Sequence, residues 1–445
     1  MAKKTQGGPV NEDPMKAAAS APKKTPVRNK AKRVVKLGLV GLGPRGETLT
    51  AALNGLEHEI QIVAICDVKQ AMIDKMLGIY KKNGKEAPRT YTDYRDLIAD
   101  SEVEGVLVPT SWNSHLAIAA EAMFAGKYAG IEVGGASSIE ELWQLVHAAE
   151  RTGVSCMMLE NCCYGRNELL VMNMVRQGLF GELVYAEGGY EHDLSEMGGE
   201  LERGHERAIH NFFRCGDLYP THQLGPIAKT FDINRGNRFL SLTSSATKQV
   251  GFNARAVAKY GHDGKWGDVR FAQGDVVTTV IKCARGENIT LTHCVSLPRP
   301  YTRHARIQGS RGIWSEDCHG IYVEGISKKA YPLDIAGNPY EVHYWDPVEK
   351  YYKKYEHPIW KDYLRSGVVG GHGGMDGLVL SAFAAAIREG KPTPIDVYDV
   401  AAWMATTTLS EQSIALGSMP VAYPDFTNGK WMTRGRDTFS GKYAL

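Results

Sequence analysis

Short apolar runs alternate with amphipathic stretches in the chain from Val34 onward. Apolar runs between turn residues are typical of buried strands, and a 3.6-residue periodicity between them is typical of helices. The runs that predict strands are Val34–Val40, Gln61–Cys66, Gly105–Val108, Tyr128–Val133 and Ser155–Leu159. Because strands that alternate with helices indicate βαβ units, we expect an α/β domain over residues 34–163 with a doubly wound parallel sheet.

The pattern changes after Asn161. A helix is expected from Asn167 to Gln177, and two late helices are expected around Gly377–Glu389 and Val397–Leu416. Between them lie segments rich in β-branched and aromatic residues, which favour strands. These segments are Glu182–Glu187, Arg238–Ser245, Val276–Cys283, Ile289–Val295 and Arg303–Gln308. We therefore expect a second, sheet-dominated domain over residues 164–445.

The positive charge of the chain is concentrated at its N-terminus. Residues 1–36 carry ten Lys or Arg and two acidic residues, which leaves about −6 on the remainder of a chain whose net charge is +2. We interpret residues 1–33 as a basic flexible tail, because their Lys, Ala, Pro and Gly cannot bury a core. A folded part without a basic surface disfavours nucleic acid as a partner.

The eight cysteines are scattered, with no CxxC pair and no Cys/His ligand spacing. Neither a disulfide framework nor a structural zinc site is indicated, and we assign no metal. No segment approaches the roughly 18 apolar residues that a membrane span needs. The sequence does not decide between the cytoplasm and, if an export signal was removed, the periplasm or the exterior.

The first predicted strand runs into the turn Gly41-Leu42-Gly43-Pro44-Arg45-Gly46. In a G-x-G-x-x-G turn, Gly41 permits the tight bend, Gly43 lets the backbone approach a pyrophosphate, and Gly46 allows close helix packing. The N-terminus of the following helix then faces the phosphates. Among 48 glycines this motif alone is weak, because turn glycines often bind nothing.

Asp67 strengthens that interpretation. It ends the second predicted strand, about 20 residues beyond the glycine turn, where a carboxylate can bind both hydroxyls of a ribose. Its charge would repel a 2′-phosphate, which favours NAD over NADP, although Arg45 lies close in the sequence. The sequence therefore predicts a Rossmann domain that binds NAD.

These features resemble the glucose-fructose oxidoreductase/inositol dehydrogenase superfamily. The resemblance implies a C-terminal α+β domain with a large open, mostly antiparallel sheet. Further motifs follow in order along the chain: Trp112-Asn113-Ser114-His115, Leu159-Glu160-Asn161, Gly188-Gly189-Tyr190, Tyr219-Pro220-Thr221-His222, Pro298-Arg299-Pro300-Tyr301 and Pro424-Asp425-Phe426-Thr427. Together they resemble glycoside hydrolase family 109, the NAD-dependent N-acetylgalactosaminidases, and this narrower resemblance covers the chain from about Lys36 onward.

One motif departs from the dehydrogenases of that superfamily. Where they commonly carry Glu-Lys-Pro, with the lysine as acid and base, this chain has Glu132-Val133-Gly134. Valine cannot transfer a proton, so the departure disfavours a plain sugar dehydrogenase and agrees with the glycosidase family.

The resemblance implies a redox-neutral glycosidase with tightly bound NAD. In that mechanism NAD⁺ accepts hydride from C3 of the sugar, and the ketone acidifies the C2 proton, which a base removes. The leaving group at C1 is then eliminated, water adds at C1, and hydride returns to C3. The implied product is terminal N-acetylgalactosamine, released from a glycan or small glycoside.

We expect the catalytic residues to be His222, Tyr301 and Tyr190. An imidazole suits a base that titrates near neutrality, and phenols can donate to sugar oxygens or relay protons. The resemblance places Tyr190, Arg207, Tyr219 and Tyr301 at the sugar. The expected cofactor contacts are Gly41, Gly43, Pro44, Arg45, Gly46, Asp67, Trp112, His115, Glu132, Val133, Asn161, Tyr219 and His222.

Two motifs stay outside these sets. Glu160 can orient a partner without reacting, and His372-Gly373-Gly374-Met375-Asp376 can be only a helix start.

Two other functions remain open, an NAD(P)-dependent sugar oxidoreductase and a catalytically silent sugar- or nucleotide-binding protein. An open sheet leaves apolar surface to cover, so we expect a homo-oligomer, a dimer or larger.

Overall fold

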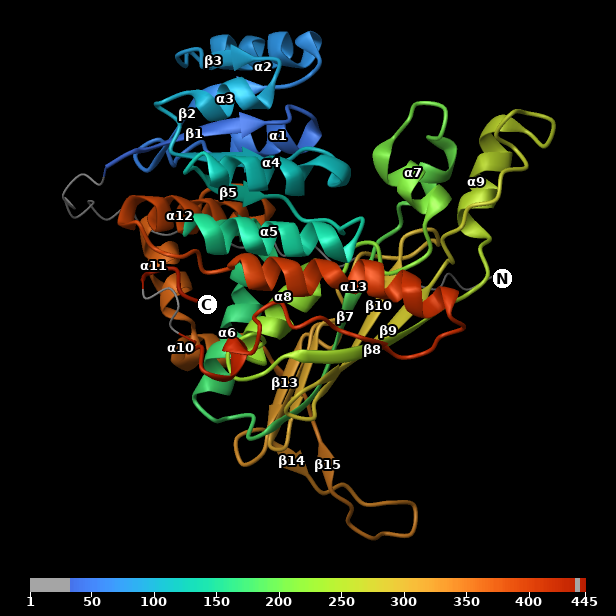
Figure 1. The fold of residues 1–445 in the computed structure, drawn as a ribbon. Helices are drawn as coiled ribbons and strands as arrows, with labels where there is room; N and C mark the ends of the chain where they lie inside the picture. Colours follow the sequence, from blue (N-terminus) through green and yellow to red (C-terminus); the bar gives the residue numbers. More distant parts are fainter. Residues whose placement is uncertain (1–32, 437–440) are drawn as a thin grey trace, which may run out of the picture.

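The computed structural model describes residues 33–436 and 441–445. The basic tail therefore lies outside the described residues except for Arg33. The N-terminal domain has a six-stranded parallel sheet with strand order β3-β2-β1-β4-β5-β6 (Figure 1). The strands are β1 (Val35–Val40), β2 (Ile60–Cys66), β3 (Arg89–Tyr91), β4 (Gly105–Val108), β5 (Tyr128–Ile131) and β6 (Cys156–Met158). The strand order reverses beside β1, where doubly wound sheets bind their ligands.

The five predicted strands are present, with small differences at their ends. Only β3 was not predicted, because it is short, lies at the sheet edge and has no buried residue. The helices of this domain are α1 (Pro44–Ala52), α2 (Gln70–Lys82), α3 (Tyr94–Ala99), α4 (Trp112–Phe124) and α5 (Ile139–Thr152).

The ends of α5 follow from local sequence. The Ser138 hydroxyl accepts the Glu141 N–H over 3.2 Å, and the Glu141 carboxylate accepts the N–H of Ser137, one residue before the expected partner. Gly153 ends the helix in the left-handed region with φ 69°, where a residue without Cβ is favoured. The predicted capped helix is thus confirmed, with the capping box displaced by one residue.

The C-terminal domain has a nine-stranded sheet with order β16-β13-β12-β11-β7-β10-β9-β8-β17. Only β7 and β10 pair in parallel among these strands, so the expected mostly antiparallel sheet is confirmed. The strands are β7 (Leu183–Glu191), β8 (Phe239–Ala246), β9 (Val277–Cys283), β10 (Asn288–Cys294), β11 (Arg306–Gly309), β12 (Gly312–Ser315), β13 (Gly320–Val323), β16 (Asp346–Pro347) and β17 (Val421–Ala422).

Helix α8 lies against this sheet and brings the Tyr219–His222 motif to the cleft. A Cβ at Gly188 on β7 would lie 2.2 Å from the Gln223 side chain, so the glycine lets the side chain of the helix pack directly on the backbone of the strand. The helices of this domain are α6 (Arg166–Arg176), α7 (Glu206–Phe213), α8 (Thr221–Thr230), α9 (Gly251–Tyr260), α10 (Glu349–Tyr355) and α11 (Pro358–Ser366).

The last two long helices, α12 (Met375–Glu389) and α13 (Val397–Ala415), return to the N-terminal domain. A Cβ at Gly130 would lie 3.2 Å from the Phe383 ring, and the Thr393 hydroxyl donates to the Cys156 carbonyl. Figure 1 shows α12, α5 and α13 at the junction of the two sheets. Both predicted late helices are confirmed.

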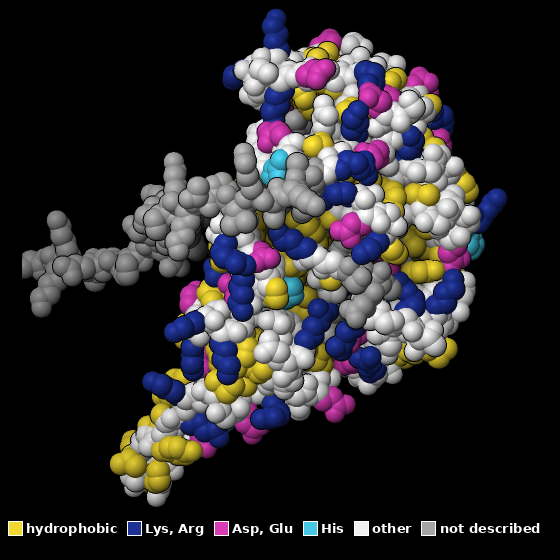
Figure 2. All heavy atoms as spheres, turned by 90° about the vertical axis from the view of Figure 1, so that its left-hand side faces the viewer, with side chains coloured by type: hydrophobic (Ala, Val, Ile, Leu, Met, Phe, Trp, Pro, Cys, Tyr) yellow, Lys and Arg dark blue, Asp and Glu magenta, His cyan; other side chains and the backbone are white. Residues whose placement is uncertain are grey.

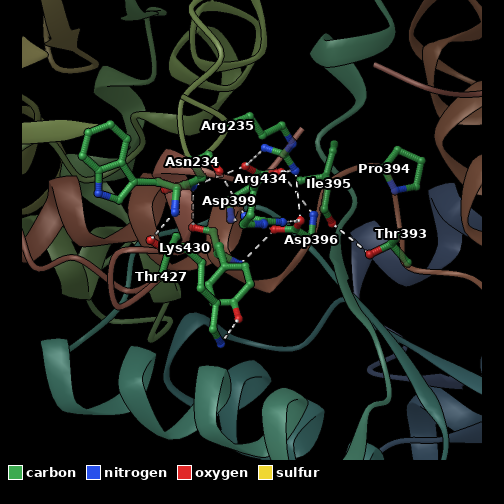
Figure 3. Close-up of polar contacts among 12 residues, drawn as sticks. Asn234, Arg235, Thr393, Pro394, Ile395, Asp396, Asp399, Thr427, Lys430 and Arg434 are labelled. Atoms are coloured by element: carbon green, nitrogen blue, oxygen red, sulfur yellow. Dashed lines mark hydrogen bonds and ion pairs between the residues drawn. The ribbon is translucent and has the colours of Figure 1, made fainter. Parts of the chain in front are cut away.

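A cluster of buried charges fixes the start of α13 (Figure 3). Asp396 caps the helix with a complete capping box, and Asp399 lies in its first turn. The Arg235 guanidinium donates to both carboxylates over 2.7–2.9 Å, and Lys229 pairs with Asp399 over 2.6 Å. Arg434 from the C-terminal segment also donates to Asp396. We call these five residues the α13 ion cluster.

An arm projects from the sheet at the bottom of Figure 1, where β14 (Lys329–Ala330) pairs with β15 (Val342–His343). Apolar side chains gather on this projection, seen in yellow in Figure 2. The exposed ones are Tyr331, Leu333, Ile335, Tyr340, Tyr344 and Trp345. The sequence pattern did not predict the arm. Among the helices described, none is long and apolar enough to cross a membrane.

Candidate active site

A cleft of about 1230 Å³ opens where the C-terminal ends of the parallel strands face the second sheet. The N-terminal domain contributes Gly41, Gly43, Pro44, Arg45, Asp67, Trp112, Glu132, Val133 and Asn161 to its walls. The C-terminal domain contributes Tyr190, Glu206, Arg207, Tyr219, His222 and His372. Residues remote in sequence, most of them expected at a cofactor or sugar, therefore line one cavity.

The glycine turn has the shape that a pyrophosphate requires. Gly41 has φ +100°, and its N–H donates to the Cys66 carbonyl over 2.8 Å. A Cβ at Gly43 would meet no atom within 4 Å, so open space lies in front of this backbone. A Cβ at Gly46 would lie 2.2 Å from the Gly41 carbonyl, which only glycine tolerates. The turn thus leaves the room that dinucleotide phosphates would fill.

Asp67 faces the same cleft from the end of β2. One carboxylate oxygen accepts the Leu42 N–H and the other accepts the Lys69 N–H, each over 2.9 Å. These bonds fix the carboxylate beside the glycine turn, and each oxygen can still accept another hydrogen bond. The residues present therefore fit a nucleotide with free ribose hydroxyls.

Arg45 is held by two carboxylates. Its Nε donates to Glu132 over 2.8 Å, and its two terminal nitrogens donate to Asp376 over 3.2 Å. Asp376 also accepts from Asn161 and His372. Burial alone would raise the pKa of Asp376, but its contacts with His372 and Arg45 hold that pKa well below the usual range. The arginine charge is therefore neutralised, which leaves little attraction for a 2′-phosphate.

Asp376 was not among the predicted site residues, because its motif was interpreted as a helix start. It does lie in the first turn of α12, but it also joins that helix to the glycine turn across 331 positions. The signal available was an acidic residue at a helix N-terminus, which more often serves the helix alone.

His222 lies at the start of α8 and forms a pair with Glu160, which follows β6. Nδ1 of His222 donates to Oε1 of Glu160 over 2.8 Å, and the Glu160 side chain is completely buried. Burial alone would lower the pKa of His222, but the Glu160 charge raises it well above the ordinary value. The same contact lowers the pKa of Glu160 despite burial, which opposes that change.

The expectation that His222 titrates near neutrality is therefore corrected. A buried carboxylate 2.8 Å away stabilises the imidazolium and makes the ring a stronger base than an isolated histidine. Glu160, which sequence reasoning left out, is the residue that causes this shift. Its place directly after a strand of the parallel sheet was the signal that could have found it.

Aromatic rings form one wall of the cleft. The Tyr219 ring lies 4.6 Å from Tyr190 and 5.8 Å from Trp112, between centroids. The Arg207 guanidinium donates to the Tyr219 hydroxyl over 3.2 Å and lies 4.6 Å from the centroid of its ring. Glu206 accepts the backbone N–H of Trp112, so the start of α7 contacts the N-terminal domain.

His192 was not predicted. Its Nδ1 lies 3.2 Å from the Tyr190 hydroxyl, and its ring lies 5.1 Å from that of Tyr301. His192 follows Tyr190 by two positions at the end of β7, and alternate strand residues share a face, so the period of the strand could have indicated it. Tyr301 is half-exposed beside this group and is not among the residues that line the cleft.

His115 was expected at the cofactor, but its side chain is completely buried and does not line the cleft. It lies on the inner face of α4 with Trp112, Leu116 and Ala119, at the spacing of a helix face that packs on a core. Burial lowers the pKa of His115 to about 4, so the ring is neutral. Neither ring nitrogen has a hydrogen-bond partner among the described residues, so the expected cofactor contact of His115 stays a prediction.

The fold and the cleft define a two-domain enzyme with a dinucleotide site in its first domain. Residues 35–160 match the model of the oxidoreductase family with an NAD-binding Rossmann fold. Residues 164–433 match the model of the glycosyl hydrolase 109 C-terminal domain. The chain belongs to glycosyl hydrolase family 109 and is an NAD-dependent glycosidase.

Whole-length relatives agree with the family models. An alpha-N-acetylgalactosaminidase of Tannerella forsythia is 39% identical over 440 residues, covering 94% of this chain and 91% of the relative. A glycosyl hydrolase family 109 protein of Parabacteroides distasonis is 38% identical over 441 residues, covering 94% and 92%.

Solved structures confirm the fold. A levoglucosan dehydrogenase in complex with NADH and levoglucosan has a TM-score of 0.64 at 18% identity, covering 88% of this chain and all of that one. An inositol dehydrogenase homologue of Azotobacter vinelandii in complex with NAD⁺ has a TM-score of 0.62 at 17% identity, covering 89% and 100%.

Proposed function

We propose that the enzyme releases terminal N-acetylgalactosamine from glycans or glycosides by oxidation, elimination, hydration and reduction within one cleft. The observation that carries this proposal is the His222–Glu160 pair in a wall of the cleft that the glycine turn and Asp67 also line. A strong base beside a dinucleotide site suits removal of a proton next to a carbonyl group. Val133 in place of a lysine further disfavours simple dehydrogenation.

When bound, NAD⁺ supplies the hydride acceptor for C3 of the sugar and its reduced form supplies the hydride donor. The chain positions it with the glycine turn at the phosphates and Asp67 at the ribose, while Asn161 and Val133 line the cleft further along the sheet edge. Arg45 holds the turn in place through Glu132 and Asp376 instead of binding a phosphate itself.

His222 removes the proton from C2. The ring nitrogen that does not bind Glu160 is the one left for substrate, and the carboxylate stabilises the imidazolium as it forms. The electron pair of the C2–H bond forms the C1–C2 double bond while the C1–O bond breaks. The departing oxygen takes a proton from solvent water, and water then adds at C1. His222, whose proton exchanges with solvent, delivers a proton back to C2.

Tyrosine hydroxyls stabilise the oxygen at C3, where negative charge develops as the C2 proton leaves. Tyr190 and Tyr219 line the cleft, and Arg207 donates to the Tyr219 hydroxyl, which aligns it. Tyr301 lies next to this wall, 6.1 Å from Tyr190 between ring centroids, within reach of a sugar that extends past the cleft mouth. His192 orients the Tyr190 hydroxyl through its Nδ1.

The decisive experiment uses a chromogenic α-N-acetylgalactosaminide in D₂O with NAD⁺. We expect release of the aglycone with deuterium at C2 of the product and no net accumulation of NADH. Release without deuterium would contradict elimination. Net NADH formation with a free sugar would instead support a sugar oxidoreductase, and the absence of any turnover would support a silent binding protein.

We also propose that the enzyme forms a homo-oligomer in which a second copy covers the arm. Support comes from its exposed apolar side chains, because a projection with this surface is costly to leave in water. Light scattering after gel filtration should give at least a dimer, and Leu333→Ser with Ile335→Ser should lower the mass. A monomeric wild type would contradict this proposal.

A further inference from the structure

Three side chains beside the cleft bring together the donor types of a zinc site. Glu160 and Cys162 come from the segment after β6, and His222 comes from α8. One carboxylate oxygen, the sulfur and one ring nitrogen all lie within 4.8 Å of one another. Carboxylate, thiolate and imidazole are ligands of Zn²⁺, and three protein ligands with an open fourth position are typical of accessible zinc sites.

Glu160 shows that this arrangement is incomplete. Its Oε1 accepts from His222 and from the Cys162 backbone N–H, which lies 3.1 Å away. Its Oε2 is fully buried but accepts no hydrogen bond of normal geometry from any residue between 33 and 436 or 441 and 445. The buried Thr221 hydroxyl contributes to the lowered pKa of Glu160, but it makes no hydrogen bond of normal geometry there. The carboxylate is therefore incompletely paired, and a cation would satisfy it.

We propose that Glu160, Cys162 and His222 bind one Zn²⁺, and that the bound cation inhibits the enzyme. Ligand atoms around a tetrahedral Zn²⁺ lie about 3–4 Å apart, so side-chain rotations that move the sulfur by about 1 Å complete the site. The Cys162 thiol releases its proton as the sulfur binds, and the single proton of the neutral imidazole moves from Nδ1 to Nε2.

The inhibition follows from the two nitrogens of one ring. A cation bound at Nδ1 of His222 leaves the remaining ring proton on Nε2, so the nitrogen that faces the cleft cannot accept a proton. This part of the inference rests on the proposed base role of His222. Binding of the cation does not rest on it, so the two parts can fail separately.

The sequence alone did not indicate a metal here because the ligands are dispersed. Glu160 and Cys162 are two positions apart, and His222 comes 60 positions after Cys162 on a different element. Zinc motifs are recognised by paired cysteines and histidines at ligand spacing, such as CxxC, and this chain has no pair at that spacing. The ligand set becomes visible only when α8 packs against the segment after β6.

Binding is tested with the purified holoenzyme, NAD-loaded, by titration calorimetry with Zn²⁺ and by the ultraviolet thiolate charge-transfer band of Cd²⁺. We expect one tight equivalent and the sulfur band in the wild type, and loss of both in Cys162→Ser. Cys318→Ser, which removes an exposed thiol, is the matched control and should bind as the wild type does. Equal binding by Cys162→Ser and wild type would overturn the site.

Inhibition is tested on the same proteins. Zn²⁺ should inhibit the wild type reversibly, with recovery after a chelator, and Cys162→Ser should need at least about 10-fold more Zn²⁺ for half inhibition. Cys162→Ala gives a second variant if the serine disturbs folding. Binding at Cys162 without inhibition would overturn the regulatory part. If no substrate turns over without Zn²⁺, the proposed function fails, while calorimetry and the Cd²⁺ band still decide the site.

Discussion

The α13 ion cluster and the His222–Glu160 pair are both buried and charged, but they differ in how completely their atoms are paired. In the cluster, both oxygens of Asp396 and both oxygens of Asp399 accept hydrogen bonds, from Lys229, Arg235, Arg434 and backbone N–H groups. Figure 3 shows Arg235 and Arg434 beside the two carboxylates. In the pair, one oxygen of Glu160 accepts none among the described residues. Every carboxylate oxygen of the cluster is therefore hydrogen-bonded, whereas one carboxylate oxygen of the pair can still accept a hydrogen bond or a cation.

This difference in pairing indicates that the cluster stabilises the fold and that the pair takes part in the reaction. A fully paired cluster offers nothing to a ligand, and its removal exposes opposite charges to a dry interior. A partly paired carboxylate beside a cleft stabilises the imidazolium that forms when the histidine accepts a proton, and it leaves room for another partner. We therefore expect mutations in the pair to affect turnover and mutations in the cluster to affect folding.

His222→Gln should have the largest effect. Glutamine keeps a polar side chain but cannot act as a base, so kcat should fall about 10²- to 10⁴-fold, about 3–5 kcal/mol in activation free energy. The free energy of unfolding should fall less than for a broken ion pair, because the glutamine amide can still donate to the buried Glu160 carboxylate. Steady-state kinetics and urea unfolding on the same preparation measure both, and full turnover would remove His222 from the mechanism.

Asp399→Asn should show the reverse. The neutral amide leaves Arg235 and Lys229 buried without their shared carboxylate, which should lower the free energy of unfolding by about 3–5 kcal/mol. Activity per folded molecule should remain near that of the wild type. Urea unfolding followed by active-site titration with substrate separates the two quantities, and equal stability of variant and wild type would refute the comparison.

Asp217, in the loop before α8, is a third buried carboxyl group, and it should make the free energy of unfolding depend on pH. Burial raises its pKa to about 7, and its Oδ2 accepts no hydrogen bond among the described residues. A carboxyl group with a raised pKa binds its proton more tightly when folded, so the unfolding free energy should decrease as pH rises from about 4 to about 7. The expected loss is about 4 kcal/mol.

Asp217→Asn removes this titration. The melting temperature of the variant should fall less than that of the wild type between pH 4.5 and pH 8, and the variant should be the more stable at the upper end. Calorimetric melting of both proteins across this range is the measurement. Parallel curves would show that Asp217 does not titrate in this window.

Local patterns predicted most of the fold. The glycine turn, the buried parallel strands and both late helices depend on short-range signals, namely glycine geometry, apolar runs and caps. The arm was missed because short exposed strands have no periodicity to read. His115 was expected at the cofactor, but it is buried on α4, and its spacing from Trp112 and Ala119 is that of a core-facing helix position.

The site was predicted less completely, because its important contacts are long-range. The residues that line the cleft could be named from motifs, but their partners could not. Glu160 meets His222 across 62 positions, and Asp376 meets Arg45 across 331. No local pattern specifies which carboxylate reaches which base, and this pairing is what sets the charge of the base.

The smallest effect is expected at the solvent side of the α13 ion cluster. Lys430 pairs with Glu150 over 2.7 Å, but the lysine side chain is 54% exposed, so water and salt screen the pair. Lys430→Ala should lower the free energy of unfolding by about 0–1 kcal/mol, and less at high salt. Urea unfolding at two salt concentrations, with Asp399→Asn as the reference, measures this. If Lys430→Ala lowered the free energy of unfolding as much as Asp399→Asn does, burial would not be the reason that the cluster is essential for stability. The different effects expected for the cluster and for the His222–Glu160 pair would then need another explanation.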